Sequence, residues 1–464
     1  MKRIKALLVN PVIHDFAAYD FWLKPLGLLY VGAFLSHLGF EVHLIDLLNR
    51  HDPDVHKFVK VPKDKYYGTG KFPTEVIEKP PVLSDIPRKF KRYGAPLEYL
   101  EYRIKEIGKV EVVFVTSTMT YWYHGVWETI KLLKTLTDAP VILGGIYTNI
   151  LPGHAMKSPA DFVFPSNHLE LLPKFLKDKL DIKVNYSPID WFEDLDPVYH
   201  LYKNVGYLVF TASIGCPFRC TYCMTPIMWQ RYRRRTEEKI IYAMERYLDM
   251  FNVKDVAFFD DAFLVNKDRT KKLLTLLINR RINKRVRFHL PNGIHARLVD
   301  EEIAHLLHEA NFKTIKLGYE TSGELQKKTG GKVFDSDLER AVGLLKKAGF
   351  THKEVAAYVL INMPGQKLQD VINALYFVNS LGIRISLNEY TPIPGTPDWK
   401  ELVKNGIFQE NIDPLLLNNT ALPFWWRYGM SKEEIEYAKY LTRMLNNTLE
   451  CQLQSERIKH KSLY

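Results

Sequence analysis

Short apolar runs alternate with helical segments through the first third of the chain. The runs are rich in branched and aliphatic side chains and have the length of buried parallel strands. They lie at residues 4–9, 40–44, 110–115, 141–145 and 161–164. Apolar side chains at helical spacing predict helices over residues 25–35 and 126–136. Strands joined through helices form a parallel, doubly wound sheet, which binds its ligands at the carboxyl ends of the strands.

Two stretches interrupt this alternation. Residues 50–98 are rich in Lys, Tyr and Pro, show no regular period and predict an inserted loop. Residues 181–205 contain Pro188 and Pro197 around an acidic and aromatic segment, which is typical of a linker. We therefore expect a Rossmann-like domain over residues 1–180 that is followed by this linker.

Strand and helix patterns alternate again in the second half of the chain. The expected strands lie at residues 207–211, 255–259, 286–290, 314–318, 354–360 and 384–387. The expected helices lie between them at residues 238–251, 268–282, 300–310, 335–348 and 368–381. Such repeats predict a partial (β/α)6 barrel over residues 206–400, with its chemistry at the carboxyl ends of the strands. Residues 401–464 are expected to form a helical C-terminal region. The fold class is therefore α/β throughout.

Composition narrows the class of protein. The chain has 464 residues, which is enough for about two or three domains with substantial cores. No apolar run reaches the length of a membrane span and the first residues show no signal-peptide pattern, so we expect a cytoplasmic protein. The net charge of +11 is spread along the chain, and nucleic acid is therefore not an expected partner.

Three cysteines provide the strongest chemical signal. Cys216, Cys220 and Cys223 follow the expected strand at residues 207–211 and fit on one tight loop. Their sulfurs can converge on one soft metal centre and leave a coordination position open, because the fourth cysteine, Cys451, lies far along the chain. A zinc ion completed by a histidine is the alternative, although structural zinc sites usually take their ligands in two close pairs.

This spacing, with the aromatic Tyr222 before the last thiol, resembles the cluster loop of the radical S-adenosylmethionine (SAM) superfamily. The resemblance implies a 4Fe-4S cluster on the three cysteines, with SAM chelating the free iron. Polar groups at later strand ends resemble further signatures of that superfamily. They place Asp260 and Asp261 near the SAM amino group, Glu320 near its ribose and Pro394 near its adenine, while Tyr222 shields the cluster. Taken alone, Asp261 could equally cap a helix.

The first domain carries a second resemblance. A strand, a Ser/Thr-rich loop, a helix and a strand ending in Gly-Gly follow in the order found in cobalamin-dependent radical SAM enzymes of the class B methyltransferase type. The resemblance places the hydroxyls of Thr116, Ser117 and Thr118 beside the cobalamin tail and lets the backbone at Gly144 and Gly145 approach the cofactor. The Asp-x-His-x-x-Gly motif of many cobalamin proteins is absent. The alternative that this domain kept the fold and lost the cofactor therefore stays open.

The two resemblances together imply an enzyme. A reduced cluster would cleave SAM to methionine and a 5'-deoxyadenosyl radical, with electrons from an external donor such as a ferredoxin or flavodoxin. With cobalamin as a further cofactor, the expected function is methylation of an unactivated carbon of a small-molecule or lipid-like substrate. A radical SAM cyclase, rearrangement or oxidation enzyme with an ancillary or empty first domain is the alternative. A tRNA methylthiotransferase would need three further cysteines for a second cluster, and only Cys451 remains.

Two further features each have a structural and a functional interpretation. His289 stands at the end of an expected strand, where it would be a proton-transfer group or a histidine bound to the backbone. The aromatic run at residues 425–428 would either cover the mouth of the barrel or pack a helix against it.

Overall fold

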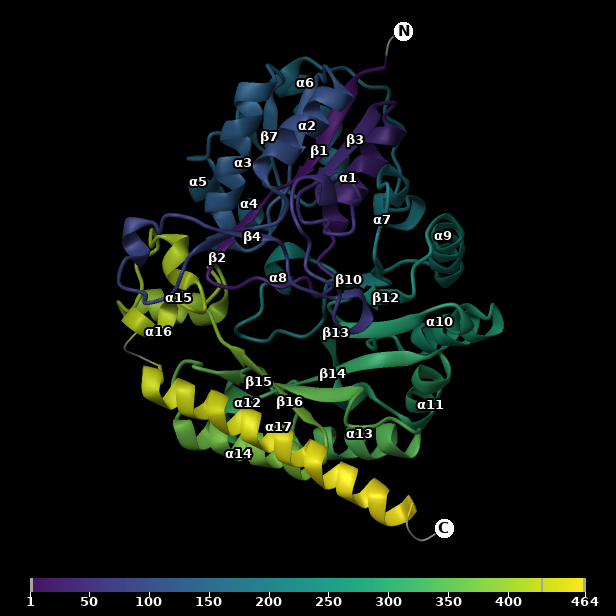
Figure 1. Ribbon diagram of the computed structural model, residues 1–464, viewed down its shortest axis with the longest axis vertical. Coiled ribbons are helices and arrows are strands. Elements are labelled where there is room, and N and C mark those ends of the chain that lie inside the picture. The colour runs from purple at the N-terminus through teal and green to yellow at the C-terminus, as the bar shows by residue number, and fades with distance from the viewer. Residues whose placement is uncertain (1–2, 427–428, 462–464) are drawn as a thin grey trace. The chain divides into compact units, whose positions relative to one another are not determined.

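The computed structural model describes residues 3–426 and 429–461 (Figure 1). The chain divides into two compact units. The first contains Met1–Phe210, Arg234–Asp255 and Asp413–Leu416, and the second contains Thr211–Arg233, Val256–Ile412 and Leu417–Tyr464. In the part of the chain that the structure describes, no helix combines the length and the apolar character that a membrane crossing requires.

A five-stranded parallel sheet forms the centre of the first unit. Its strands lie in the order β3-β1-β6-β7-β8, so the predicted doubly wound sheet is confirmed. Val9 pairs with both Ile45 and Val115, and Val115 pairs with Leu143, so the carboxyl ends of four strands share one edge. The strands are β1 Lys5–Asn10, β3 Glu41–Asp46, β6 Val112–Val115, β7 Val141–Leu143 and β8 Phe162–Val163. The helices of this unit are α1 Leu26–His37, α2 Leu97–Ile107, α3 Tyr123–Leu136, α4 Ile146–Ile150, α5 Pro152–Ala155, α6 Leu172–Leu180, α7 Trp191–Asp194 and α9 Glu237–Met250.

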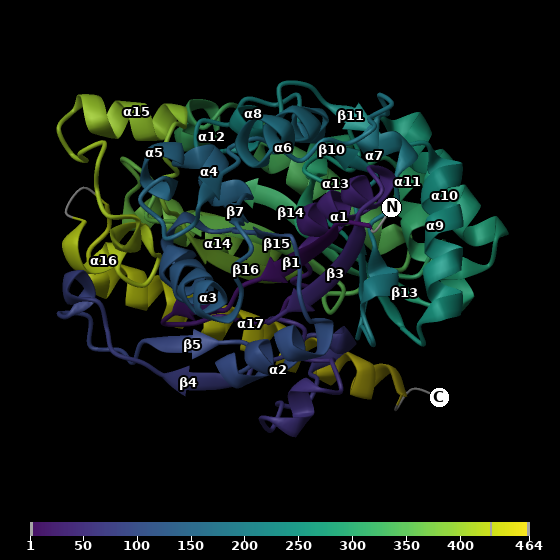
Figure 2. The ribbon, with the colours of Figure 1, turned by 90° about the horizontal axis from the view of Figure 1, so that it is seen from above.

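A small antiparallel sheet occupies part of the segment expected as an inserted loop. Its order is β2-β5-β4, and β4 and β5 run side by side in Figure 2. The strands are β2 Ile13–Asp15, β4 Thr74–Val76 and β5 Lys91–Tyr93. The buried residues of its core are Ile13, Leu48, Phe72 and Tyr93. Strands of three residues are too short to show a clear alternation, which is why residues 50–98 gave no periodic signal.

Arg50 links the inserted segment, residues 50–98, to neighbouring residues through hydrogen bonds. It is 3 % exposed, and its Nε donates a hydrogen bond to Asp20 Oδ2 at 2.8 Å. Other N–H groups of the guanidinium donate to the carbonyl oxygens of Pro62 at 3.1 Å and Gly68 at 2.9 Å. Because a guanidinium has five donors and no acceptor, its burial requires this set of carboxylate and carbonyl partners.

A six-stranded sheet carries the second half of the fold. Its order is β16-β15-β14-β13-β12-β9, so strands that follow each other in the chain are neighbours and the predicted partial barrel is confirmed. The strands are β9 Leu208–Phe210, β12 Asp255–Phe258, β13 Arg287–His295, β14 Phe312–Glu320, β15 Val355–Ile361 and β16 Arg384–Glu389, and a separate pair consists of β10 Ser213–Ile214 and β11 Arg233–Arg234. The helices are α8 Thr225–Met228, α10 Lys267–Asn279, α11 Glu301–Glu309, α12 Glu324–Lys328, α13 Asp335–Lys347 and α14 Leu368–Ser380.

One strand of this sheet runs further than its sequence pattern predicts. A register shift lies between Leu290 and Ile294 of β13, and the strand then resumes. The sequence Pro291-Asn292-Gly293 reads as the end of a strand, but a bulge accommodates it within the sheet. The carboxyl end of β13 is therefore His295.

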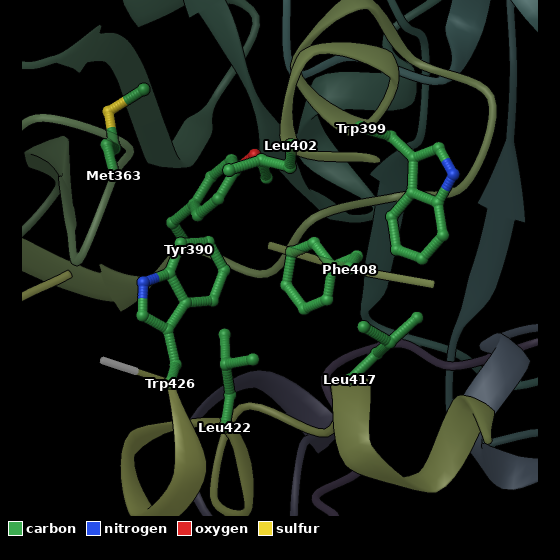
Figure 3. Close-up of a cluster of buried hydrophobic side chains, with 8 residues drawn as sticks. All are labelled: Met363, Tyr390, Trp399, Leu402, Phe408, Leu417, Leu422 and Trp426. Atoms are coloured by element: carbon green, nitrogen blue, oxygen red, sulfur yellow. The ribbon is translucent and has the colours of Figure 1, made fainter. Parts of the chain in front are cut away.

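The C-terminal region is helical, as predicted. Its helices are α15 Pro397–Lys404, α16 Leu422–Trp425 and α17 Lys432–Lys461, and α17 packs beside α14 and β16 (Figure 1). An apolar cluster of this region consists of Met363, Tyr390, Trp399, Leu402, Phe408, Leu417, Leu422 and Trp426 (Figure 3). Phe408 stacks on Trp399 and meets Trp426 edge-on, with ring centroids 5.2 Å apart in both pairs. Trp426 is 5 % exposed within this cluster, which supports the packing interpretation for this residue, whereas residues 427 and 428 lie outside the described residues.

Candidate active site

The loop between β10 and α8 carries the three cysteines. Cys220 is buried, Cys216 and Cys223 are partly exposed, and all three are free thiols. Gly215 begins the loop with a φ of 80°, and a Cβ at this position would lie 2.6 Å from the carbonyl oxygen of Arg231. The turn that presents the first thiol therefore requires glycine.

Burial controls the ionisation of these thiols. It raises the pKa of Cys216 to about 11, and the neighbouring thiols add to the rise while the Lys332 ammonium opposes it. Burial likewise raises the pKa of Cys220, again against the charge of Lys332. The thiols are thus close enough to influence one another, and each has to lose a proton before it can bind iron.

The donor set suits a 4Fe-4S cluster. Within residues 3–426 and 429–461, no three Cys, His, Asp or Glu side chains gather closely enough to share one metal ion. In an iron–sulfur cube each thiolate binds a different iron atom, so the sulfurs need not meet at one point. Three free thiols on one loop would hold three irons and leave the fourth to another ligand.

Asp260 and Asp261 hold the start of the cysteine loop in place. Asp260 Oδ2 accepts the N–H of Ala212 at 3.0 Å, and Oδ1 accepts the Ser213 hydroxyl at 2.6 Å. Asp261 Oδ2 accepts the N–H of Gly215 at 3.0 Å. Burial raises the pKa of Asp261, and the hydrogen bond from Gly215 opposes the rise. Both carboxylates therefore position the loop, and their contact with the SAM amino group stays a prediction.

Glu320 lies at the carboxyl end of β14 in a strained conformation. Its φ is 72°, in the left-handed region that residues other than glycine rarely adopt. Burial raises the pKa of Glu320, and Lys332, whose Nζ lies 4.0 Å from Oε1, opposes the rise. Because Lys332 also acts on the pKa of Cys216 and Cys220, the carboxylate and the ammonium both lie beside the cysteine loop. The predicted contact between Glu320 and the ribose stays a prediction.

Lys332 is a site residue that sequence reasoning missed. It lies two residues after Gly330, whose φ is 112° and where a Cβ would lie 3.2 Å from the Cα of Cys220. The N–H of Thr221 also donates to the carbonyl of Thr329 at 3.4 Å. The segment after α12 thus packs directly on the cysteine loop. The available signal was a Gly-Gly pair before a lysine, far from the cysteines along the chain.

The apolar cluster of Figure 3 supports the loop through Tyr222. The Tyr222 side chain packs against the cluster, and burial raises the pKa of its hydroxyl well above the usual range. The carbonyl of Thr221 accepts the N–H of Asp398 at 3.1 Å, near the start of α15. Pro394 is buried just before Thr396, the residue that caps α15. Tyr222 and the segment of Pro394 therefore both border the loop, and their contacts with SAM stay predictions.

The two histidines of β13 have different surroundings. His289 is fully buried, and its Nδ1 hydrogen-bonds the Thr314 hydroxyl at 2.9 Å, which supports the structural interpretation. His295 lies at the end of the strand with its ring stacked on Phe218 of the cysteine loop, the centroids being 4.2 Å apart. Sequence reasoning missed His295 because it placed the strand end before the bulge.

The predicted cobalamin contacts lie together at the carboxyl ends of β6 and β7. The Ser117 hydroxyl donates to the carbonyl of Gly144 at 2.6 Å. Gly145 has a φ of 99°, and a Cβ there would lie 2.3 Å from the carbonyl oxygen of Ser117. Ser117 and Gly145 therefore join the two loops, while Thr116 and Thr118 remain partly exposed. Contact of these five residues with cobalamin stays a prediction.

A doubly wound sheet and a partial barrel with three thiols at its strand ends define an α/β protein equipped for an iron–sulfur centre. Residues 211–399 match the Radical SAM superfamily. The chain therefore carries a radical SAM domain.

Two relatives show how far the likeness extends along the sequence. The chain is 26 % identical over 263 residues to the hopanoid C-2 methylase of Rhodopseudomonas palustris (strain TIE-1), covering 54 % of this chain and 47 % of that protein. It is 23 % identical over 489 residues to the cytidylyl-2-hydroxyethylphosphonate methyltransferase of Streptomyces wedmorensis, covering 88 % of this chain and 83 % of that protein. The chain thus spans about half of the first relative and most of the second.

The radical SAM methyltransferase TsrM from Kitasatospora setae has a similar fold. Its structure with cobalamin and a 4Fe-4S cluster bound matches with a TM-score of 0.64 at 18 % identity, covering 87 % of this chain and 78 % of that chain. The two proteins therefore share a fold over most of this chain.

Proposed function

We propose that this protein is a radical SAM enzyme that holds a 4Fe-4S cluster on Cys216, Cys220 and Cys223 and methylates an unactivated carbon with the help of cobalamin. The cysteine loop carries the proposal, because three free thiols lie beside Lys332 and Glu320 at the strand ends of a partial barrel. The match to the Radical SAM superfamily supports the same assignment.

Different residues of the site suit different groups of SAM. When bound, a reduced cluster supplies the electron that cleaves SAM to methionine and a 5'-deoxyadenosyl radical, which removes hydrogen from the substrate. The ammonium of Lys332 suits an anionic group of SAM, and the carboxylate of Glu320 suits its ribose hydroxyls. Asp260 and Asp261 fix the backbone that leads into the cysteines, and we retain them as candidate partners of the SAM ammonium group.

Methyl transfer is supported by the first unit and by the relatives. Thr116, Thr118 and Gly144 lie at the sheet edge where doubly wound folds bind their ligands. The hopanoid and phosphonate relatives are both named for methyl transfer, and TsrM, which shares the fold, binds cobalamin. The second candidate is a cyclase, rearrangement or oxidation enzyme with an ancillary or empty first domain.

Anaerobic reconstitution with iron and sulfide tests the cluster. Replacing Cys216, Cys220 and Cys223 with Ala should abolish iron binding and SAM cleavage, because no thiolate remains on the loop. Cys451→Ala is the matched control: it removes an exposed cysteine of α17 and should change neither property. The measurements are iron content, the EPR spectrum and 5'-deoxyadenosine formation. Iron loading by the triple variant would refute the assignment.

Product analysis separates methyl transfer from the second candidate. Methylation should produce S-adenosylhomocysteine alongside 5'-deoxyadenosine, because one SAM supplies the radical and another supplies the methyl group. A cyclase, rearrangement or oxidation enzyme should release 5'-deoxyadenosine without S-adenosylhomocysteine. Chromatography of reactions with candidate small-molecule or lipid-like substrates measures both products.

Reduction of the cluster requires an external electron donor, and we propose a ferredoxin or flavodoxin for this partner. An oxygen-sensitive cluster also favours a reducing compartment, and we propose the cytoplasm. The direct test replaces the chemical reductant with a purified reduced flavodoxin or ferredoxin. SAM cleavage with either protein supports the proposal. Cleavage that occurs with dithionite but with neither protein contradicts it.

A further inference from the structure

His295 lies beside the cysteine loop but has no role in the function proposed so far. As the last residue of β13, it pairs with Gly318 of β14, the strand that ends at Glu320. Its ring stacks on Phe218, which lies between the first two cysteines, with 4.2 Å between centroids and 24° between planes. The imidazole is therefore held flat against the loop that binds the cluster.

One ring nitrogen of His295 is buried without a partner. The residue is 1 % exposed, and its Nδ1 forms no hydrogen bond among the residues that the structure describes. Buried polar atoms are nearly always hydrogen-bonded, and the exceptions are often completed by a ligand, an ion or a water molecule. The position of Nδ1 next to the cysteine loop points to a ligand of this site.

The charges around His295 define the chemistry of that ligand. Burial is the main cause that lowers the pKa of His295 to about 2, and Lys332 and Arg297 lower it further. The imidazole is thus neutral at physiological pH, with an N–H donor at one ring nitrogen and an acceptor at the other. Arg297 also lies over the Phe218 ring, with Cζ 5.4 Å from the centroid. Because lysine and arginine side chains are donors only, the ligand that binds beside His295, Lys332 and Arg297 is an anionic acceptor.

We propose that Nδ1–H of His295 donates a hydrogen bond to the carboxylate of SAM, with Lys332 and Arg297 supplying the positive charge that this carboxylate favours. The inference rests on the proposed function and adds a SAM-binding residue to it. His295 orients SAM beside the cluster and takes no part in breaking its bonds.

Substitutions of His295 separate Nδ1 from the rest of the ring. His295→Asn places an amide nitrogen near the position of Nδ1, His295→Gln places it near Nε2, and His295→Phe keeps the stacking on Phe218 without either nitrogen. In the reconstituted holoenzyme, SAM affinity measured by equilibrium binding should be close to wild type in the Asn variant and about tenfold or more weaker in the other two. His289→Gln is the matched control within β13 and should leave SAM affinity unchanged, because His289 contacts Thr314 inside the sheet.

EPR of the reduced cluster reports the same contact without turnover. The SAM-dependent change of the signal should need a higher SAM concentration in the Phe variant than in the Asn variant. Equal SAM affinity in the wild type and the Phe variant would overturn the inference. If the Phe variant fails to load iron, the Asn and Gln variants are compared with each other. Equal SAM affinities in these two variants would also overturn the inference.

The midpoint potential of the cluster, measured without SAM, tests whether a cluster sulfur accepts the hydrogen bond from Nδ1–H in place of the SAM carboxylate. A shifted potential in the Phe variant with unchanged SAM affinity would assign the hydrogen bond to the cluster and overturn the contact with SAM. Failure of the wild type to bind iron or SAM refutes the proposed function itself. Normal wild-type binding combined with normal binding in every His295 variant refutes this inference alone.

Discussion

Hydrogen bonds to two adjacent carboxylates determine the path of the backbone into the cysteine loop. Asp260 binds Ala212 and Ser213, and Asp261 binds Gly215, the residue before the first thiol. A carboxylate accepts several hydrogen bonds at once and pairs strongly with N–H donors. The two aspartates therefore contribute to cluster binding through geometry, in addition to any contact with SAM.

Asp260→Ala should lower the free energy of unfolding by about 2–4 kcal/mol, because it removes two charge-assisted hydrogen bonds and leaves the buried N–H of Ala212 without its acceptor. Ser213→Ala removes only the 2.6 Å bond and should cost about 1 kcal/mol. Urea denaturation of the apoprotein measures both values. A loss in the Asp260 variant no larger than that in the Ser213 variant would contradict the positioning role.

Glu128 of α3 joins two strands of the small antiparallel sheet to the first unit's helical layer. It forms a 2.8 Å hydrogen bond with His14 of β2 and accepts a 2.7 Å bond from Nε of Arg92 in β5. Burial alone would raise the pKa of Glu128, but these hydrogen bonds outweigh it and hold the pKa at about 2. The helix and the small sheet are thus linked by a carboxylate that stays ionised in mild acid.

The stability of this link should depend on pH. A carboxyl whose pKa is lower in the folded state stabilises the protein fully above its unfolded value of 4.5, and this contribution disappears as the pH falls toward 2. We expect Glu128 to account for about 2 kcal/mol of the free energy of unfolding that is lost over this pH range. This value is lower than the full pKa shift would give, because the side chain is partly exposed. Urea denaturation at several pH values should show a flatter dependence for Glu128→Gln. Parallel curves for the variant and the wild type would argue against the link.

Arg50→Met should destabilise the protein by about 3–5 kcal/mol, because the substitution leaves the Asp20 carboxylate buried without its cation. Burial raises the pKa of Asp20, while the hydrogen bond from Tyr207 and the charges of Lys24 and Arg50 oppose the rise, and the Arg50 guanidinium contacts the carboxylate directly. Adding Asp20→Asn to this variant should recover part of the loss. Arg384→Ala is the control: it removes an arginine that is 47 % exposed and pairs with Glu450 at 3.0 Å, and it should cost less than about 0.5 kcal/mol.

Sequence patterns revealed the long elements and missed the short ones. A strand such as β15 was predictable because seven residues in a row are apolar or aromatic. Strands of three residues in the insertion give no comparable signal, and Pro291-Asn292-Gly293 concealed the second part of β13. The cysteines were recognisable because they are close in sequence. Lys332 and His295 join them only through folding, so no local pattern marked either residue.

The first unit gives the whole molecule a second site for a cofactor if cobalamin binds at the edge of its sheet. The glycine pair after β7 offers a matched test, because its two members have different surroundings. Around Gly144, the nearest atom to an added Cβ is the carbonyl oxygen of Phe164 at 3.8 Å, so a side chain fits. At Gly145 the φ of 99° and the 2.3 Å approach to Ser117 exclude one.

Anaerobic expression with added cobalamin should give a protein that keeps a corrin absorption spectrum after desalting. Gly144→Val should abolish this spectrum and retain the fold, because the added side chain fits beside Phe164 but would occupy the space that the predicted cofactor contact requires. Gly145→Val should instead destabilise the first unit, as circular dichroism during thermal unfolding would show. Normal corrin binding by the Gly144 variant would refute the contact, and absence of corrin in the wild type would favour the candidate with an empty first domain.

The apolar cluster that supports Tyr222 has a consequence for biosynthesis. Its members lie between residues 363 and 426, downstream of the cysteine loop in the order of translation. A ribosome that has just made the three cysteines has therefore not yet made Trp399, Phe408 or Trp426. The loop gains this support only once those aromatic residues have emerged and packed, so it reaches its supported form after translation has passed residue 426.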